Sequence, residues 1–416
     1  MPPIAFIAGT YQPDRCGVAH YTRHLRETLA EQGIQSTVLT THEAAQAASD
    51  PTVQGVIDRW HINHLVSLVK AIHATKAEIL HIQHAAGTYG FDRAIFLLPL
   101  LLRMSQWHQP IVTTVHEYGW WEWQPKYIPA STLEWLKTWG QTQGWWDRED
   151  GFLLTQSNAL ITTNTDAEQV IASRLPHLVS RVHRIPIAAN VESVYPDRLQ
   201  AKQALCQRYG WSTDDLIVVF FGFLHPVKGI ESLLDAFQQV LAVHPTAKLL
   251  LLGGVESLAL QGEAADRYWN QLQAKIAELQ LQDGVQMTGY LEAEAVSQCL
   301  AGADLGVLPF NHGVTLKSGS LLALMAHRLP VIATQASPAD PDITTHLVQL
   351  IEPRNRDALA AALIQMLTQP DLRARLANAG YAFSRQFSWS QITQSHLKIY
   401  RSLLKSPTFI SSEFAA

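Results

Sequence analysis

The chain has 416 residues, of which 47% are hydrophobic and 16% are charged, and its formal net charge is −5 at pH 7. This length exceeds what a single hydrophobic core usually serves, so the sequence predicts a globular protein of two domains. The weakly acidic balance argues against a nucleic-acid partner, which requires a strongly basic surface, and against a polybasic membrane-binding patch.

The N-terminal segment begins with a short apolar run, residues 4–8, which ends in a glycine and predicts a buried strand. It lacks the basic start and the long apolar stretch of a signal peptide, and no apolar stretch in the chain reaches the ~20 residues of a spanning helix. Cys16, Cys206 and Cys299 form no C-x-x-C pair, which predicts a reducing compartment without a disulfide framework. We therefore expect a cytoplasmic protein with at most peripheral membrane contact.

Short apolar runs alternate with helical patterns along the whole chain. The runs are rich in Val, Ile and Leu without polar alternation, which is typical of strands buried on both faces of a parallel sheet. Their alternation with helices predicts an α/β protein of doubly wound, Rossmann-like units. Candidate helices cover residues 18–32, 57–73 and 165–173. Candidate strands cover residues 4–8, 37–40, 78–83, 111–116, 159–163, 182–187, 216–222, 248–252, 285–288, 305–309, 330–334 and 347–351.

The domain boundary is expected where a strand ends in IPIAAN and a polar stretch containing a proline follows. We predict an N-terminal Rossmann-like domain over residues 1–190 and a C-terminal one over residues 199–385. The last helical pattern, residues 388–404, has apolar residues on one face and belongs to a closing segment, residues 386–406.

A tryptophan-rich segment, at about residues 118–150, follows the strand at residues 111–116. Trp120, Trp121 and Trp123 begin it and are candidate acceptor-side residues, because indole faces stack on the apolar faces of sugars. A contact with a membrane interface or another subunit, and a locally packed insertion, are alternatives that the same residues allow.

In open parallel sheets, ligands bind beyond the carboxyl ends of the strands. The loop after residues 216–222 reads FFGFLHPVKGIESLL, in which Gly222 permits a close backbone approach and Lys228 directly precedes a predicted helix. An ammonium beside a helix N-terminus suits a diphosphate. A solvated lysine at a turn fits the same residues.

A second loop of this kind follows the strand at residues 305–309 and reads NHGVTLKSGSLLALM. We expect the backbone amides of five successive residues at its end to point outward at a helix start and to hold a second phosphate. An ordinary helix capped by Ser318 is the alternative. Two such loops at strand ends of one sheet favour a diphosphate site. The five residues are Lys317, Ser318, Gly319, Ser320 and Leu321.

Several other chemistries lack their sequence patterns. No G-x-G-x-x-G joins a strand to a helix, which argues against a nicotinamide dehydrogenase, and P-loop, G-x-S-x-G and metal-ligand patterns are absent. No paired carboxylates stand at matched positions, which argues against a glycosidase. His84, His116 and Glu117 lie at strand ends, where such residues either serve a site or are simply hydrogen-bonded structural groups.

An ordered series of segments resembles a known family. FGFLHPVKGIESLLDAFQQV, KLLLLGG, VQMTGYL, ADLGVLPF and LLALMAHRLPVIAT look like the C-terminal domain of the retaining glycosyltransferases of family 4. PDRCGVAHYTRHLRETL and VTTVHE are similar to that family's first loop and helix and to its strand ending in histidine. FSWSQITQSHLKIYRSLL resembles its closing helix, which crosses back to the N-terminal domain. The resemblance spans nearly the whole chain and implies the GT-B fold, two Rossmann-like domains facing across a cleft.

The resemblance also implies roles for individual residues. Lys228 would bind the donor diphosphate, the amides near Gly17 would approach the donor from the other domain, and His116 would contact the transferred sugar. The loop at residues 317–321 would hold the diphosphate and the sugar. The loops at residues 254–256 and 289–291 would flank the nucleotide base and include Gly254, Glu256 and Tyr290. A metal or other cofactor would not be needed, because lysine and helix termini neutralise the leaving diphosphate.

The chain departs from the family's pattern at four positions. Phe223 replaces the arginine that usually precedes the lysine, and Arg328 stands where glycine is usual. Thr315 and Ala323 occupy the places of two glutamates, of which the first normally holds hydroxyls of the donor sugar and the second the ribose. The phosphate-binding features persist, whereas the sugar-recognition features are altered.

The sequence thus predicts a retaining glycosyltransferase of carbohydrate biosynthesis that moves a sugar from a nucleotide-diphosphate donor to a carbohydrate or other hydroxyl acceptor. A polyprenyl- or lipid-linked acceptor is compatible with this prediction. Lys228 would stabilise the leaving group and His116 would orient the sugar. One alternative is a catalytically impaired GT-B protein that binds nucleotide sugars or acts as a scaffold. Another is a GT-B phosphorylase or epimerase.

Overall fold

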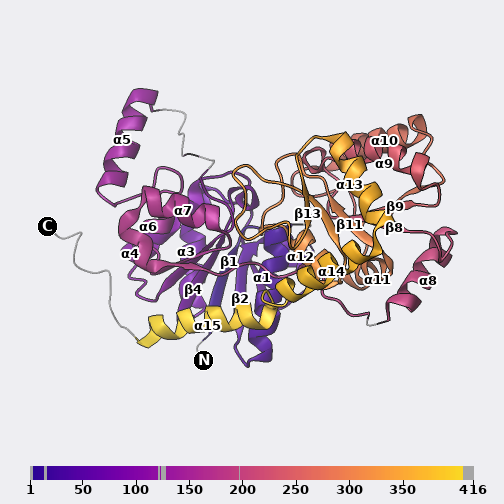
Figure 1. Cartoon of the computed structure of the whole chain (residues 1–416). Coiled ribbons are helices and arrows are strands. Elements are labelled where there is room, and N and C mark those ends of the chain that lie inside the picture. Colours follow the sequence, from indigo (N-terminus) through magenta and orange to yellow (C-terminus); the bar gives the residue numbers. More distant parts are fainter. Residues whose placement is uncertain (1–2, 14–15, 120–121, 123–127, 196, 406–416) are drawn as a thin grey trace. The chain divides into compact units, whose positions relative to one another are not determined.

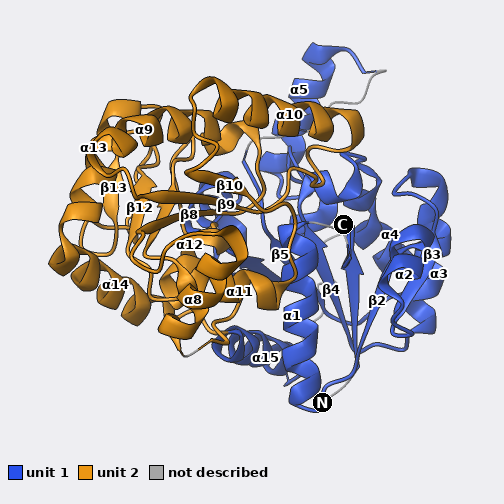
Figure 2. Cartoon of the chain, turned by 90° about the vertical axis from the view of Figure 1, so that its right-hand side faces the viewer, with its two compact units in different colours: residues 1–186, 389–416 blue, residues 187–388 orange. Residues whose placement is uncertain are grey.

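The structure is a computed structural model that describes residues 3–13, 16–119, 122, 128–195 and 197–405. The chain divides into two compact units (Figure 2), with unit 1 formed by Met1–Pro186 and Trp389–Ala416 and unit 2 by Ile187–Ser388. Each unit has its own hydrophobic core around one sheet. Both units are α/β, as predicted from the alternating strands and helices.

The described residues of unit 1 form a seven-stranded parallel sheet in the order β3-β2-β1-β4-β5-β6-β7 (Figure 1). Helices α1 and α15 lie along one face of it and α3 and α4 along the other. The strands are β1 Ile4–Ala8, β2 Ser36–Thr41, β3 Val53–Ile57, β4 Ile79–His84, β5 Ile111–Val115, β6 Ala159–Thr162 and β7 Val182–Arg184. The helices are α1 Gly17–Glu31, α2 His42–Ala48, η1 Ile62–His64, α3 Leu65–Ala74, η2 Ala86–Tyr89, η3 Ala94–Leu97, α4 Leu98–Met104, α5 Ala130–Thr142, α6 Phe152–Thr155, α7 Thr165–Arg174, η4 Pro176–Arg181 and α15 Trp389–Lys405.

Unit 2 contains, over its described residues, a six-stranded parallel sheet in the order β10-β9-β8-β11-β12-β13. The strands are β8 Ile217–Phe221, β9 Lys248–Leu252, β10 Val285–Met287, β11 Leu305–Leu308, β12 Val331–Thr334 and β13 Gln349–Ile351. The helices are α8 Arg198–Tyr209, η5 Pro226–Lys228, α9 Ile230–Val243, α10 Gly262–Glu278, α11 Ala293–Gly302, α12 Gly319–Ala326, α13 Arg356–Thr368 and α14 Pro370–Ser384.

Each sheet has one point where the strand order reverses. In unit 1 it lies between β1 and β4, and in unit 2 between β8 and β11. Loops leaving the carboxyl ends of such strands diverge to opposite faces of the sheet and leave room for a ligand between them. In unit 2 these loops are the two that the sequence singled out, after residues 216–222 and 305–309.

The last helix, α15, packs against α1 within unit 1. Its buried face carries Ile392, Leu397 and Tyr400, which matches the apolar face expected from the sequence. The Tyr400 hydroxyl lies 2.6 Å from Nδ1 of His81, a fully buried residue of β4. This contact joins a strand to a helix more than 300 residues further along the chain.

The prediction was wrong for the second candidate helix. Residues 57–73 were expected to form one helix, whereas Ile57 ends strand β3, which the sequence did not reveal, and α3 begins only at Leu65. Strand β3 reads VQGVI and lies at the sheet edge, where Gln54 and Gly55 break the apolar run. An edge strand needs less apolar surface than a central one, so its pattern is weaker.

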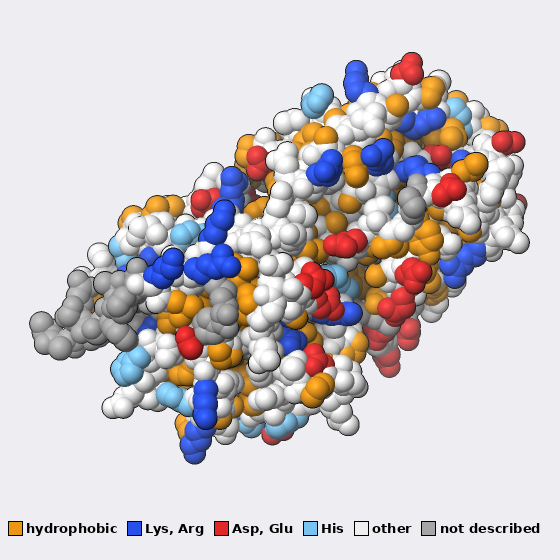
Figure 3. Space-filling view, turned by 90° about the horizontal axis from the view of Figure 1, so that it is seen from below, with side chains coloured by type: hydrophobic (Ala, Val, Ile, Leu, Met, Phe, Trp, Pro, Cys, Tyr) orange, Lys and Arg blue, Asp and Glu red, His pale blue; other side chains and the backbone are white. Residues whose placement is uncertain are grey.

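The surface agrees with the weakly acidic composition. Figure 3 shows Lys and Arg side chains dispersed among acidic and apolar ones on the face seen from below. Among the described residues, none of the helices combines the length and the hydrophobicity that a bilayer span requires.

Candidate functional site

The first loop of the unit 2 site leaves β8 at Gly222 and reaches α9 through η5. Lys228 ends η5, and Gly229 caps α9 with φ +70°, a left-handed conformation that favours glycine. A Cβ added to Gly229 would collide with the carbonyl of Pro309, which follows β11. Helix α9 begins at Ile230, one residue after the predicted start at Gly229. Because Gly229 has no side chain, the two loops can pack closely.

The second loop runs from β11 to α12 and is attached to the first. The Asn311 backbone N–H donates to the Val227 carbonyl (3.0 Å), and its side-chain amide donates to the Pro226 carbonyl (2.9 Å). A Cβ on Gly222 would lie 3.0 Å from Oγ of Ser320, the second residue of α12. The two loops thus lie next to each other at the switch point of the sheet.

Lys228 projects its ammonium into this region. Nζ lies 3.6 Å from the centroid of the Phe310 ring, and among the described residues no carboxylate pairs with it. The residue is half-buried, and burial lowers the pKa of the Lys228 ammonium to about 8. A partly desolvated cation without a counter-ion is an arrangement that an anionic ligand would stabilise.

The start of α12 offers fewer free amides than the sequence suggested. The Ser318 N–H donates to the Thr315 carbonyl, the Lys317 N–H approaches Oγ1 of Thr315, and the Leu321 N–H donates to the Ser318 side chain, which caps the helix. Within the described structure, the N–H groups of Gly319 and Ser320 have no such partner. Two amides, rather than five, are therefore available for a phosphate.

Asn190 was not among the residues singled out from the sequence. Its side chain lies beside the helix start, because a Cβ on Gly319 would be 3.3 Å from its Cγ. Its Oδ1 is buried and makes no hydrogen bond to any residue the structure describes. A buried amide oxygen without a donor indicates a place for a ligand hydroxyl or a water. Asn190 ends the segment IPIAAN, which the sequence marked only as a domain boundary.

The loops expected to flank a nucleotide base also meet within unit 2. Gly253 forms an isolated bridge with Gly289, and a Cβ on Gly254 would lie 3.2 Å from the backbone nitrogen of Tyr290. The Tyr290 side chain is 40% exposed, and Glu256 is exposed. These residues follow β9, which adjoins β8 in the sheet, and β10, which adjoins β9.

The two positions that depart from the family's glutamates differ in environment. Ala323 lies inside α12 and is fully buried in the core of unit 2, so its methyl group faces no ligand. Thr315 holds the turn before α12 through its carbonyl and hydroxyl. Arg328 has φ +55° just beyond α12, a left-handed conformation that explains why glycine is usual there.

In unit 1, His116 directly follows β5. Its Nε2 lies 2.8 Å from Oε1 of Gln83, and its ring meets the edge of Tyr21 with 4.9 Å between the centroids. Because an amide oxygen only accepts, Nε2 carries the proton in this arrangement and Nδ1 keeps a lone pair. Burial, assisted by His84 and His396, lowers the pKa of His116 to about 3, so the ring is neutral at pH 7.

His84 is enclosed rather than open to solvent. Its Nε2 lies 3.0 Å from Oδ1 of Asp150, and both side chains are 1% exposed. Tyr89 stacks on the His84 ring, and the edge of Phe96 meets it. In this position His84 supports the loop that carries Asp150, and an acceptor would have to displace neighbouring side chains to contact it.

The loop that contains Asp150 gathers buried carboxyl groups. Asp147 accepts a hydrogen bond from the Tyr118 hydroxyl (2.6 Å), and Glu149 pairs with Arg174 (2.7 Å). Burial, reinforced by the charge of Asp150, raises the pKa of Asp147 to about 6 and that of Glu149 to about 7. The segment WDREDG was included in the tryptophan-rich stretch, but its acidic residues were not recognised as a cluster.

The remaining predicted residues of unit 1 are less enclosed. Gly17 is exposed at the first position of α1, and a Cβ there would meet no atom within 4 Å. Glu117 is exposed next to His116. Trp120, Trp121 and Trp123 lie outside the described residues.

Comparison with known proteins gives consistent similarities. Residues 202–383 match the family "Glycosyl transferases group 1". The chain is 24% identical over 394 residues, 92% of this chain and 93% of the other, to the GDP-mannose-dependent monoacylated alpha-(1-6)-phosphatidylinositol monomannoside mannosyltransferase of Corynebacterium glutamicum.

Two solved structures share the fold over almost the full length. A glycosyltransferase of Rickettsia africae has a TM-score of 0.72 at 15% identity and covers 97% of this chain and 99% of its own. HepE of Anabaena, in complex with UDP and glucose, has a TM-score of 0.69 at 15% identity and covers 97% and 100%.

Proposed function

The chain is a glycosyltransferase with the GT-B fold that carries a group 1 glycosyltransferase domain over residues 202–383, and we propose that it transfers a sugar from a nucleoside-diphosphate donor with retention of the anomeric configuration. The bond between the anomeric carbon and the diphosphate breaks, and a bond from that carbon to an acceptor hydroxyl oxygen forms. The hydroxyl proton passes to the departing diphosphate. No metal is required in this proposal, because protein groups neutralise the leaving group.

One observation carries the proposal. The Lys228 ammonium and the N–H groups of Gly319 and Ser320, none of which has a hydrogen-bonding partner among the described residues, lie on adjacent loops at the switch point of one sheet. As the diphosphate departs, negative charge builds on its oxygens, and donors already aimed at that place lower the barrier. Removing a single donor of this type typically costs about 2.7–4 kcal/mol of transition-state stabilisation.

The donor is proposed to be a GDP- or UDP-sugar. A relative across the full length is described as GDP-mannose-dependent, and a structural neighbour was solved with UDP and glucose. The acceptor is proposed to be a carbohydrate or lipid-linked hydroxyl, since that relative is described as acting on an acylated phosphatidylinositol mannoside. His116, neutral at pH 7, is proposed to accept a hydrogen bond from a hydroxyl of the transferred sugar at Nδ1 without carrying charge.

The test is nucleoside-diphosphate release from a panel that includes GDP-mannose and UDP-glucose, with the product anomer assigned by NMR. Lys228→Ala should abolish release while the protein stays folded. Lys248→Ala is the matched control, because Lys248 begins β9, at the end of the strand away from the proposed site, and donates a hydrogen bond to the Asp283 carbonyl. A fully active Lys228→Ala protein would remove Lys228 from the mechanism.

A second function is favoured by one specific feature. Ala323 is sealed in the core and Thr315 is engaged in the turn, so neither replaces the carboxylates expected to hold the donor's hydroxyls. The chain would then bind nucleotides without transferring a sugar. Calorimetry with GDP and UDP separates the cases, because binding without release from any sugar nucleotide would establish a binding protein.

A further inference from the structure

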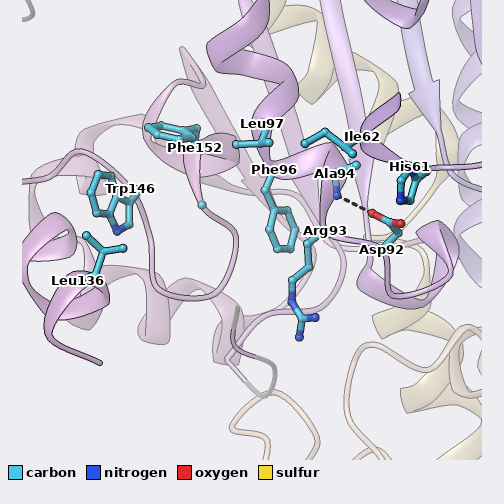
Figure 4. A pocket seen from close by; sticks show the side chains of 11 residues that line it. His61, Ile62, Asp92, Arg93, Ala94, Phe96, Leu97, Leu136, Trp146 and Phe152 are labelled. Carbon is cyan, nitrogen blue, oxygen red and sulfur yellow. Dashed lines mark hydrogen bonds between the residues drawn. The ribbon is translucent and has the colours of Figure 1, made fainter. Parts of the chain in front are cut away.

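Unit 1 contains a pocket that the proposed transfer chemistry does not use (Figure 4). Its volume is about 390 Å³, within the range of small-molecule sites. It is lined by η1 and η3 on one side and by α5 and α6 on the other. Phe96 and Leu97 come from η3, Leu136 from α5 and Phe152 from α6.

The lining is apolar at one end and charged at the other. Leu136 and Trp146 lie at one end and Asp92 lies at the other, next to His61, whereas the Arg93 side chain extends away from Asp92 below Phe96 (Figure 4). Asp92 accepts a hydrogen bond from the N–H of Ala94 (2.8 Å), the first residue of η3. A ligand that matches this gradient has a hydrocarbon body and a polar end.

The wall of the pocket continues into an exposed aromatic surface. Leu136 lines the pocket, whereas its neighbour Trp135 is 62% exposed and Trp139 is 37% exposed on the same helix. The Trp135 and Trp139 rings stack, with 5.9 Å between their centroids. The edge of Trp145, 39% exposed, meets Trp139 at 4.7 Å. Exposed tryptophans of this kind favour the boundary between hydrocarbon and water.

The pocket also adjoins the end of β4, next to the switch point of the unit 1 sheet. Phe96 lines the pocket and lies between it and His84, with 6.0 Å between the ring centroids. Gly151, another lining residue, directly follows Asp150, the partner of His84. A chain in the pocket would therefore end close to the strand ends where a ligand of this sheet is expected.

We propose that this pocket binds the aliphatic chain of an amphipathic acceptor, so that the substrate that receives the sugar is lipid-linked. This inference rests on the proposed function in one respect, that it assigns the aliphatic chain to the acceptor. A sugar would need several polar partners in the cavity, and the aromatic end supplies none but the Trp146 indole N–H.

Binding is tested on the full chain with cis-parinaric acid, a fluorescent 18-carbon fatty acid, below its micellar concentration. Leu97→Trp should fill the cavity and weaken binding by about tenfold, equivalent to excluding roughly two methylene groups. Met104→Trp is the matched control, because it introduces the same ring at a position of α4 that is 72% exposed. Absence of saturable binding to the wild-type protein, or equal binding by the Leu97→Trp protein, overturns the proposal.

A chain-length series keeps the test independent of any folding defect in the variant. Affinities of the wild-type protein for alkyl phosphates should rise by about fourfold per methylene and then level off once the pocket is full. A rise without a plateau indicates partition onto a surface and contradicts a defined pocket.

Kinetics then identify whether the bound aliphatic chain belongs to the acceptor or to a membrane lipid. Leu97→Trp should raise the KM for a long-chain alkyl glycoside and leave the KM for its methyl glycoside unchanged. Equal effects on both acceptors would contradict the assignment to the acceptor. Alkyl binding without nucleoside-diphosphate release would contradict the proposed transfer but support the pocket. Release without alkyl binding would support the transfer but contradict the pocket.

Discussion

Lys228 shows how one side chain combines a structural cost with a proposed functional role. Its ammonium lies over the Phe310 ring, and burial holds its pKa at about 8. The attraction of a cation to an aromatic face offsets part of the lost hydration. A diphosphate would supply the missing opposite charge, so we expect the bound ligand to stabilise the charged form of the Lys228 side chain.

Affinity for nucleoside diphosphate should therefore depend on pH. The ammonium is the form that binds, and it is lost as pH rises through about 8, so the affinity for GDP or UDP should fall by about tenfold per pH unit above that value. Calorimetry from pH 7 to 9.5 measures this fall. Lys228→Arg should bind with no such dependence, because arginine stays charged, and a sloping curve for it would contradict the assignment.

In unit 1, the pKa of Glu149 is shifted upward, whereas that of Lys228 is shifted downward. Its pKa is raised to about 7 by burial first and by Asp150 second, against the hydrogen bond from Gly119 and the ion pair with Arg174. Between the unfolded value near 4.5 and the folded value, the native state binds more protons, so stability falls as pH rises through this window.

Urea unfolding at pH 5 and pH 8 checks this. The loss of unfolding free energy between the two values should be smaller in Glu149→Gln than in the wild type. Glu263→Gln is the control, because the side chain of Glu263 is 94% exposed. An unchanged pH dependence in Glu149→Gln would show that Glu149 titrates normally.

At the level of elements, α15 is attached to the unit 1 sheet by buried polar contacts as well as by apolar packing. The Tyr21 hydroxyl approaches Nε2 of His396 (3.3 Å), and the Tyr21 ring also meets His116. His81 contacts Thr114 through Nε2 and Tyr400 through Nδ1. Through His81, helix α15 is thus connected to β5, the strand that precedes His116.

Tyr400→Phe should lower the free energy of unfolding of unit 1 by about 1–3 kcal/mol, because it leaves Nδ1 of His81 buried without a partner. Chemical denaturation followed by tryptophan fluorescence measures the change. Tyr209→Phe on α8 is the matched control, since no hydrogen bond of its hydroxyl is seen in the described structure. Equal effects of the two substitutions would show that the His81 contact contributes nothing.

At the scale of the molecule, each unit has its own core, and unit 1 is completed by a segment that follows unit 2 in the chain. Two cores make a single two-state unfolding transition an unsafe assumption, so each transition must be followed separately. Lys228, Gly319 and Ser320, the groups proposed to hold the diphosphate, lie within unit 2, which makes ligand effects on the unit 2 transition a direct readout.

GDP or UDP at about 100 times its dissociation constant should stabilise unit 2 by about 2.7 kcal/mol and raise the midpoint of its thermal transition. The transition of unit 1 should respond less, because the groups proposed to hold the diphosphate all belong to unit 2. Differential scanning calorimetry measures both. The same shift in Lys228→Ala would place the diphosphate elsewhere.

Much of the architecture was accessible from local patterns. Central strands buried on both faces carry uninterrupted apolar runs, so β1 and β9 were predicted with the bounds they have, whereas the edge strand β3 was missed. Lys228 could be singled out because a lysine, a glycine and a helix start follow one another in the sequence. The free amides of α12 were overestimated, since the bonds that occupy three of them depend on how the loop closes.

Order and composition along the chain were enough to specify two α/β units and the resemblance to a glycosyltransferase family, and to predict two anion-binding loops, because these inferences depend on neighbouring residues. The proximity of Gly222 to Ser320, the contact of His84 with Asp150, and the pocket that Phe96 and Leu136 line together were not accessible in this way. They join segments that are remote in sequence, and loop conformations rather than residue patterns bring them together. Folding in three dimensions therefore selected which predicted groups face a ligand, enclosed His84 and formed the apolar pocket.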